Sequence, residues 1–346
     1  MNNNKFIFIF ALVTLVVFLC VPTAYAGDPA RIGTAGGEQL LIPVGARDFA
    51  MGGASVANSK GLDAIYWNPA GLPGLQGRAS AVFSTMQIFN DINHNYLAIG
   101  LNAGSFGTLG FSLKALGFGD IPVTTNEDMD GESGQTFSPL FFTLGATYAK
   151  RLTDAINFGF SGKLVSEQID RVSASAFAFD VGIQYHQVGG IAGLSLGLAV
   201  KNIGTNLQYK GSGLLVSATE AGSARQDFRE RPAASNQLPT TIDLGLGYTY
   251  DINEDNAVLV TGLFTNNNFG NDNMKFGLEY QYTDLIALRG GYVDVARTSS
   301  TDTNYKWTLG AGVNVPLGNV KFGFDYAYRD SEYFDGNNMF SFTLGW

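Results

Sequence analysis

The stretch Phe340-Ser-Phe-Thr-Leu-Gly-Trp346 decides the fold class of this chain. Side chains alternate between the two faces of a β-strand, so Phe340, Phe342, Leu344 and Trp346 share one face. The small or polar residues between them share the other face. The stretch therefore predicts a strand with one apolar face and one polar face.

The same pattern recurs from about residue 79 to residue 346, in about fourteen segments of roughly ten residues each. Tight turns alternate with longer links, which we expect at 117–138, 168–175, 202–239, 296–303 and 330–338. Apolar faces turned outward, with short turns at one end and long loops at the other, are typical of a transmembrane β-barrel. A secreted β-sandwich is the alternative, but it has no reason to sort its loops by side.

These observations predict an all-β fold, an antiparallel barrel of about 14 strands spanning residues 79–346, surrounded by outer-membrane lipid of a Gram-negative-type bacterium. The outward rows are expected to be apolar and aromatic, and Tyr305 is assigned to such a row. The inward rows carry charges of both signs, which favours ion pairs that brace the wall or dock a plug over a porin selecting one ion sign. These inward residues are Lys163, Asp180, Lys201, Asp243, Lys275, Glu279, Arg289, Lys306, Lys321, Asp325 and Arg329.

Residues 1–26 have the pattern of a cleaved signal peptide. Lys5 precedes an apolar stretch at 6–21, and Ala24-Tyr25-Ala26 fits a cleavage site; an uncleaved anchor is the alternative. Cys20 is the only cysteine, so no disulfide is expected after cleavage. The formal net charge is −9 and no basic stripe is visible, which argues against a nucleic-acid partner.

No hydrolase elbow is found, so neither an enzyme nor a cofactor is expected. One loop, with Asn126, Asp128 and Asp130 at alternate positions, has the spacing of a calcium loop. Its twelfth position is Phe137, which cannot bind a metal. The loop is therefore interpreted as acidic and solvated, with calcium as the alternative and no metal site assigned.

Residues 27–78 lack the alternating pattern and are rich in Gly, Ala and Pro. They contain Gly45-Ala-Arg-Asp-Phe-Ala-Met-Gly-Gly-Ala54, followed by Tyr66-Trp-Asn-Pro-Ala-Gly-Leu72. Ser59 is a candidate cap for a short helix through Asp63 to Trp67.

These two motifs resemble the N-terminal signature of the PorV/PorQ family, which is related to the FadL-type transporters of hydrophobic compounds. The resemblance implies a fourteen-stranded outer-membrane barrel with residues 27–78 folded into the lumen as a plug. The motif residues are expected to hold this plug in place, with direct ligand contact as the alternative. They are Gly45, Arg47, Met51, Gly52, Gly53, Trp67, Asn68, Pro69 and Ala70.

Two functions are compatible with the resemblance. The first is a PorV-like accessory of type IX protein secretion, which holds exported proteins by its external loops and contacts the secretion translocon. The candidate contacts are in the 202–239 loop, at Arg225, Arg229, Glu230 and Arg231. The second is a FadL-like transporter that carries hydrophobic small molecules across the outer membrane.

Overall fold

The computed structural model describes residues 29–88, 92–219, 226–295 and 305–346. The predicted signal peptide, residues 1–26, lies outside the described residues. Within them, no helix is long and apolar enough to cross a membrane.

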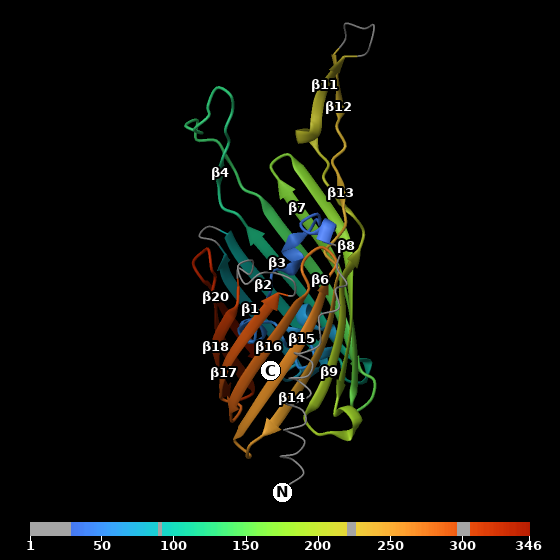
Figure 1. Ribbon diagram of the computed structural model, residues 1–346, viewed down its shortest axis with the longest axis vertical. Coiled ribbons are helices and arrows are strands. Elements are labelled where there is room, and N and C mark those ends of the chain that lie inside the picture. Colours follow the sequence, from blue (N-terminus) through green and yellow to red (C-terminus); the bar gives the residue numbers. More distant parts are fainter. Residues whose placement is uncertain (1–28, 89–91, 220–225, 296–304) are drawn as a thin grey trace.

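In the described part of the chain, fourteen antiparallel strands close a barrel (Figure 1). The barrel strands are β1 (Ala79–Ile88), β2 (Ile92–Asn102), β3 (Thr108–Gly117), β6 (Leu140–Arg151), β7 (Ile156–Ile169), β8 (Val172–His186), β9 (Leu194–Gly204), β14 (Thr241–Asp251), β15 (Asn256–Asn267), β16 (Asn273–Tyr282), β17 (Ile286–Val295), β18 (Trp307–Leu317), β19 (Val320–Arg329) and β20 (Asn337–Gly345). The first strand pairs with the last, and Phe83 lies opposite Phe342. Each strand thus hydrogen-bonds to two neighbours, as a barrel surrounded by lipid requires. The predicted strand number is confirmed.

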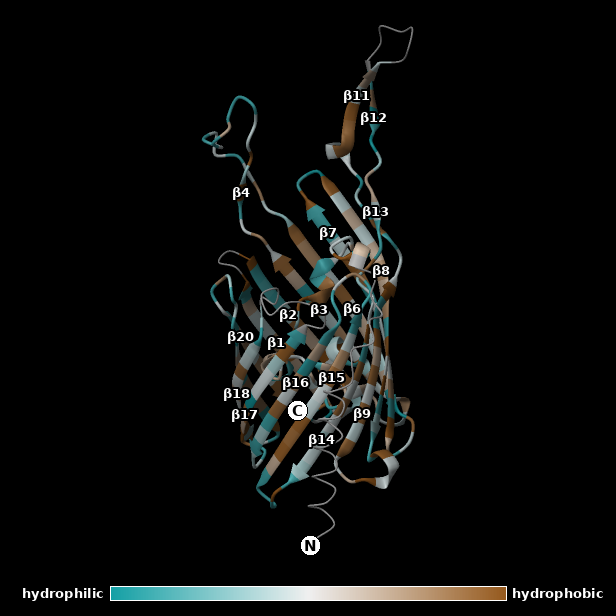
Figure 2. Ribbon diagram, viewed as in Figure 1, coloured by the Kyte–Doolittle hydropathy of each residue, from teal (hydrophilic) through white to brown (hydrophobic). Residues whose placement is uncertain are grey.

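The apolar rows face outward, as the alternation predicts. On β20, Phe342 is 41% exposed, whereas Ser341 beside it is buried at 2%. Hydrophobic and hydrophilic residues alternate along the strands in Figure 2. One assignment is wrong: Tyr305 precedes β18 and lies over the guanidinium of Arg329, which faces the lumen. It is outside the strand, so the alternation of β18 does not determine its direction.

The connections sort by barrel end, but one predicted long link, 168–175, is wrong. Strands β7 and β8 continue to Ile169 and Val172, and a tight turn with Asp170 at φ 47° joins them. The alternation persists through this stretch because Ala174 and Ala176 are small enough to stay buried on the inner face.

Three small two-stranded sheets occupy the long-loop end. They pair β4 (Ile121–Pro122) with β5 (Thr136–Phe137), β10 (Leu207–Gln208) with β13 (Ser235–Asn236), and β11 (Leu215–Thr219) with β12 (Gln226–Glu230). The β11–β12 hairpin projects far beyond the barrel rim (Figure 1).

Residues 29–78, called the N-terminal segment below, lie within the barrel (Figure 1). Their elements are η1 (Pro29–Arg31), η2 (Glu38–Leu41), α2 (Ala46–Ala50), α3 (Ala64–Trp67) and η3 (Pro69–Gly74); short 3-10 turns elsewhere are η4 (Gly104–Phe106), η5 (Val188–Gly190) and η6 (Ser212–Leu214). The expected helix is shorter than predicted, with Asp63 at its N-cap. The hydroxyl of Ser59 donates instead to Asp48.

Candidate functional site

The N-terminal segment crosses the lumen from the long-loop end to the short-turn end. At the long-loop end, the amide of Gly36 donates to the carbonyl of Gln237, at 2.9 Å. At the other end, the amide of Arg78 donates to the carbonyl of Trp346, at 2.6 Å. The chain between these points must pass through the barrel.

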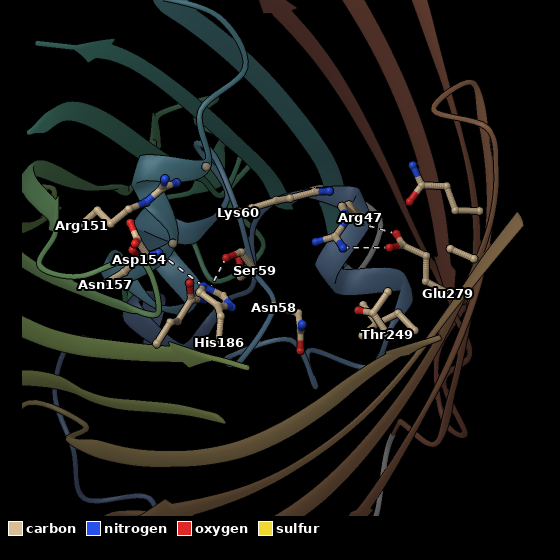
Figure 3. A pocket seen from close by; sticks show the side chains of 16 residues that line it. Arg47, Asn58, Ser59, Lys60, Arg151, Asp154, Asn157, His186, Thr249 and Glu279 are labelled. Atoms are coloured by element: carbon tan, nitrogen blue, oxygen red, sulfur yellow. Dashed lines mark hydrogen bonds and ion pairs between the residues drawn. The ribbon is translucent and has the colours of Figure 1, made fainter. Parts of the chain in front are cut away.

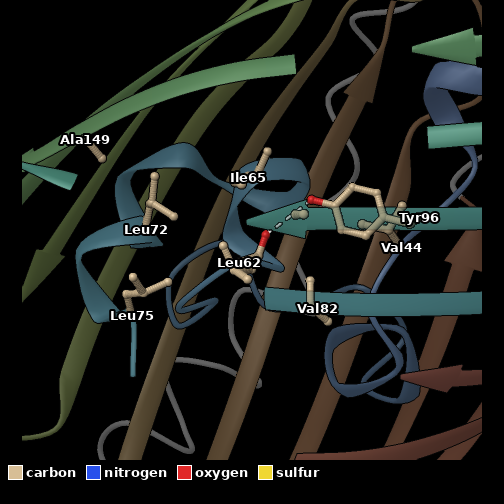
Figure 4. Close-up of a cluster of buried hydrophobic side chains, with 9 residues drawn as sticks. Val44, Leu62, Ile65, Leu72, Leu75, Val82, Tyr96 and Ala149 are labelled. Carbon is tan, nitrogen blue, oxygen red and sulfur yellow. Dashed lines mark hydrogen bonds between the residues drawn. The ribbon is translucent and has the colours of Figure 1, made fainter. Parts of the chain in front are cut away.

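Apolar packing fixes the part of the segment nearest the short-turn end (Figure 4). Leu62, Ile65 and Leu72 are buried against Val82 of β1 and Tyr96 of β2. The hydroxyl of Tyr96 also donates to the carbonyl of Leu62, at 3.3 Å. A fully buried leucine contributes about 1.5–3 kcal/mol, so this cluster is a large part of what holds the segment inside.

Asn68 joins the segment to the wall through its amide group. The side-chain nitrogen donates to the carbonyls of Val56, at 2.8 Å, and Ile183 of β8, at 3.1 Å, while the side-chain oxygen accepts from the amide of Ala70, at 3.1 Å. Pro69 after it favours the extended backbone that Asn68 adopts, with φ −158° and ψ 107°.

Wall glycines make room for this turn. A Cβ at Gly182 would lie 1.9 Å from the Asn68 Oδ1, and one at Gly159 would lie 2.2 Å from the carbonyl carbon of Pro69. The many inward glycines of the strands therefore have a specific use, because they admit the segment against the wall.

The paired glycines of the motif also permit close approach. Gly52 and Gly53 have φ of 67° and 73°, in the left-handed region. A Cβ on Gly53 would lie 2.6 Å from the ring of Trp67, and that ring donates its Nε1 hydrogen to the carbonyl of Val44, at 2.9 Å. Gly53 and Trp67 of the motif thus pack against each other within the segment.

An ion-pair network ties the segment to the barrel wall, and Figure 3 shows its Arg47–Glu279 pair. Arg47 donates from Nε and Nη2 to the two carboxylate oxygens of Glu279 on β16, at 3.1 and 2.9 Å. It also pairs with Asp48, at 2.8 Å. Arg289 on β17 pairs with both Glu279 and Asp325, each at 2.6 Å. The prediction that inward charges of both signs form ion pairs is confirmed for Glu279, Arg289 and Asp325.

Asp63 lies near this network but is not paired within the described residues, and its Oδ1 is buried without a hydrogen-bond partner. Burial and, to a smaller extent, the carboxylates of Asp48 and Asp325 raise the pKa of Asp63 to about 8. Asp63 is therefore predominantly protonated at neutral pH.

Cavities lie on both sides of the segment. Two cavities of about 400 and 420 Å³ at the short-turn side share Arg47, Lys60 and Glu279 as lining residues. A third, of about 390 Å³, lies at the long-loop side, and we call it the long-loop cavity. Its aromatic residues are Phe49, Tyr66, Trp67 and Tyr305, and its charged residues are Lys163, Lys201, Asp243, Lys275 and Arg329. Gly52, Gly53 and Trp67 of the motif line it too, so these three can touch a ligand.

A distortion in β9 adds a residue that the sequence pattern did not suggest. The pairing of β8 with β9 shifts between Phe179 and Val181, and Asn202 has φ 61°. Asp180 accepts the amide hydrogen of Asn202, at 2.8 Å, and the side chain of Asn202 accepts from Lys163, at 2.6 Å. The bulge brings Lys201 and Asn202 together to the lumen side, where strict alternation would separate them.

The remaining candidates lie in the loops. Asp128 accepts backbone amide hydrogens from Glu132 and Ser133, both at 2.8 Å, and the bond from Ser133 contributes most to lowering the pKa of Asp128. Both carboxylate oxygens thus stabilise the loop itself. No cluster of three potential metal-ligating side chains occurs among the described residues.

The proposed partner-binding residues are on or next to the projecting hairpin. Arg229, Glu230 and Arg231 are exposed there, and Arg225 lies outside the described residues. Phe228 beside them is 71% exposed.

Comparison with solved structures identifies the fold. The chain superposes on the toluene transporter TodX of Pseudomonas putida with a TM-score of 0.54 and 13% identity, covering 87% of this chain and 97% of TodX. The CymD monoaromatic hydrocarbon channel superposes with a TM-score of 0.54 and 12% identity, covering 88% of this chain and 97% of CymD. The toluene transporter TbuX of Ralstonia pickettii superposes with a TM-score of 0.53 and 15% identity, covering 87% of this chain and 97% of TbuX. The fold is that of these hydrocarbon channels. No protein-family profile and no curated protein sequence matches the chain.

Proposed function

We propose that this protein is an outer-membrane channel for small, largely apolar organic molecules, which fits the FadL-type resemblance of its motifs. The observation that carries the proposal is the long-loop cavity, which has aromatic walls and lies between the external loops and the N-terminal segment. The lipid-facing barrel shares its fold with a toluene transporter and a monoaromatic hydrocarbon channel.

In this proposal the N-terminal segment is the plug. A molecule enters from the long-loop end, rests against Trp67 and Tyr66, and passes only when the segment moves. The apolar cluster around Leu72 and the Arg47–Glu279 pair set the free energy of that movement.

The test is uptake of labelled toluene by cells that lack their own hydrocarbon channel and express this chain. Asn273→Trp places an indole at the rim of the long-loop cavity and should reduce uptake several-fold. Leu278→Trp, on the same strand but 50% exposed on the outer face, is the matched control and should leave uptake unchanged. Equal uptake by expressing cells and vector controls, with the barrel shown to be folded, would refute the proposal.

The projecting hairpin favours a second candidate, the PorV-like secretion accessory. Leu215, Val216 and Phe228 are exposed on it, well outside the barrel, and Arg229 lies opposite Val216. Exposed apolar residues rimmed by charge are typical of a protein-binding surface. Deleting 212–231 should abolish capture of an exported protein by the purified barrel and leave toluene uptake unchanged; capture that survives the deletion would exclude the hairpin as the binding surface.

A further inference from the structure

The charges of the long-loop cavity do not balance. Four cationic side chains line it: Lys163, Lys201, Lys275 and Arg329. Two of them have carboxylate partners, since Lys163 pairs with Asp180 and Lys201 with Asp243, each at 2.7 Å. Four cations less two carboxylates leave a net charge of +2 at this cavity, in a chain whose formal net charge is −9.

The other two cations form no ion pair with a carboxylate among the described residues; the Asp243 carboxylate that Lys275 faces already pairs with Lys201, at 2.7 Å. Lys275 has no hydrogen bond or ion pair there. Arg329 donates from Nη2 to the side-chain oxygen of Asn337, at 2.9 Å, and its Nε is buried without an acceptor. Its guanidinium lies 3.7 Å from the ring centroid of Tyr305 and 4.8 Å from that of Phe49.

A fifth basic side chain lies beside the cavity and is not counted in this charge. Lys114 on β3 is buried at 6% and donates only to backbone carbonyls, that of Ile42 at 3.0 Å and that of Leu40 at 3.5 Å. Its Nζ lies 4.7 Å from the ring centroid of Tyr66, which lines the cavity.

The short-turn side of the segment does not share this excess. The short-turn cavities have five cationic side chains, Arg47, Lys60, Arg151, Arg289 and Lys321. Five carboxylates balance them: Asp154, Glu279, Asp284 and Asp325 in the lining and Asp48 as the partner of Arg47, with Asp63 protonated, so the net charge there is zero (five cations less five carboxylates). Withdrawing cations from water without partners is costly. The positive excess at one side therefore indicates a site that an anion completes.

We propose that the long-loop cavity binds a small aromatic carboxylate, with the carboxylate held by Lys275 and Arg329 and the ring packed against the aromatic wall. A volume of about 390 Å³ accommodates one such molecule. The inference rests on the proposed function and narrows its cargo: an uncharged hydrocarbon would leave both cations without a partner.

The test is isothermal titration of the intact chain, folded in detergent, with benzoate, toluene and benzylamine. These probes share a ring and differ in charge. Benzoate should bind at least tenfold more tightly than toluene, and benzylamine should not bind. Benzoate affinity should also fall with added salt.

Variants locate the site. Lys275→Gln and Arg329→Gln should each weaken benzoate about tenfold and change toluene binding by less than twofold, whereas Arg329→Lys keeps the charge and should retain most of the affinity. Lys321→Gln is the matched control, because Lys321 is on the same strand as Arg329 but lines a short-turn cavity. It should have no effect.

The outcomes separate the two proposals. Toluene binding equal to or tighter than benzoate binding would overturn the inference and leave the proposed function standing. Binding of neither probe would overturn both. Loss of benzoate binding in Lys321→Gln to the same extent as in Arg329→Gln would show that the anion binds elsewhere. The comparison of benzoate with toluene on the unaltered chain tests the preference for a carboxylate even if a variant fails to fold.

Discussion

Replacing Glu279 by Gln should release the N-terminal segment from the barrel wall. The carboxylate accepts three hydrogen bonds, two from Arg47 and one from Arg289, and its side chain is only 7% exposed. Glutamine keeps the shape but removes the charge that both guanidinium groups face.

Removing one partner of a buried ion pair costs about 3–5 kcal/mol. The lower end applies here, because Arg47 keeps Asp48 and Arg289 keeps Asp325. About 3 kcal/mol lost from the closed position corresponds to roughly a hundredfold increase in the equilibrium constant for opening.

The assay is single-channel recording in a planar bilayer, with the open probability as the readout. The control is Asp325→Asn, which removes one bond from Arg289, at 2.6 Å, and none from the segment. It should change the open probability far less. An open probability unchanged by Glu279→Gln, or raised equally by Asp325→Asn, would refute the idea that the Arg47–Glu279 pair holds the segment.

Three further outcomes are expected. Gly159→Ala places a Cβ against the backbone of Pro69 and should raise the open probability, whereas a Cβ at Gly162, on the same strand, meets nothing closer than 3.7 Å and should leave it unchanged. Equal open probabilities for the two variants would contradict the close packing of the segment against Gly159. The raised pKa of Asp63, about 8 against an ordinary value of 3.8, means that protonation stabilises the closed segment. This stabilisation is complete below about pH 4 and is lost as the pH rises through 8, so opening should increase from pH 5 to pH 9, and Asp63→Asn should remove most of that dependence; a variant with the same pH profile would exclude Asp63 as the cause. Phe342→Lys places a charge on the lipid face and should cost about 2–4 kcal/mol in denaturant unfolding, whereas Thr343→Lys, which lines a lumen cavity, should cost less; equal losses would contradict the assigned faces.

The strand pattern was predictable because each strand of a barrel meets lipid on one side only. The period-two alternation that places Phe342 outward and Ser341 inward depends on nothing but the pleat and the surrounding solvent. The same local rule misplaced Tyr305, which lies outside the strand, and it missed the continuation of β7 and β8, where alanines replace larger residues.

The site was predictable only in part. The motif around Gly52 and Asn68 indicated where the segment would fold, and the inward position of Lys275 and Arg329 followed from alternation. Which cations have partners did not follow, because alternation gives the face of a side chain but not the register between neighbouring strands or the β9 bulge that brings Lys201 to the lumen beside Asp243.

The sequence by itself determined the strands and their faces, because these depend on residues close together in the chain. The tertiary structure alone decided how the segment crosses the barrel, which wall glycines it rests on, and that Lys275 and Arg329 face a cavity without a described carboxylate partner. Ion pairing and cavity shape depend on distances between residues on different strands and on the segment, such as Arg47 and Glu279, which are 232 positions apart. The period-two pattern contains no information about such distances; only closure of the barrel around the segment fixes them.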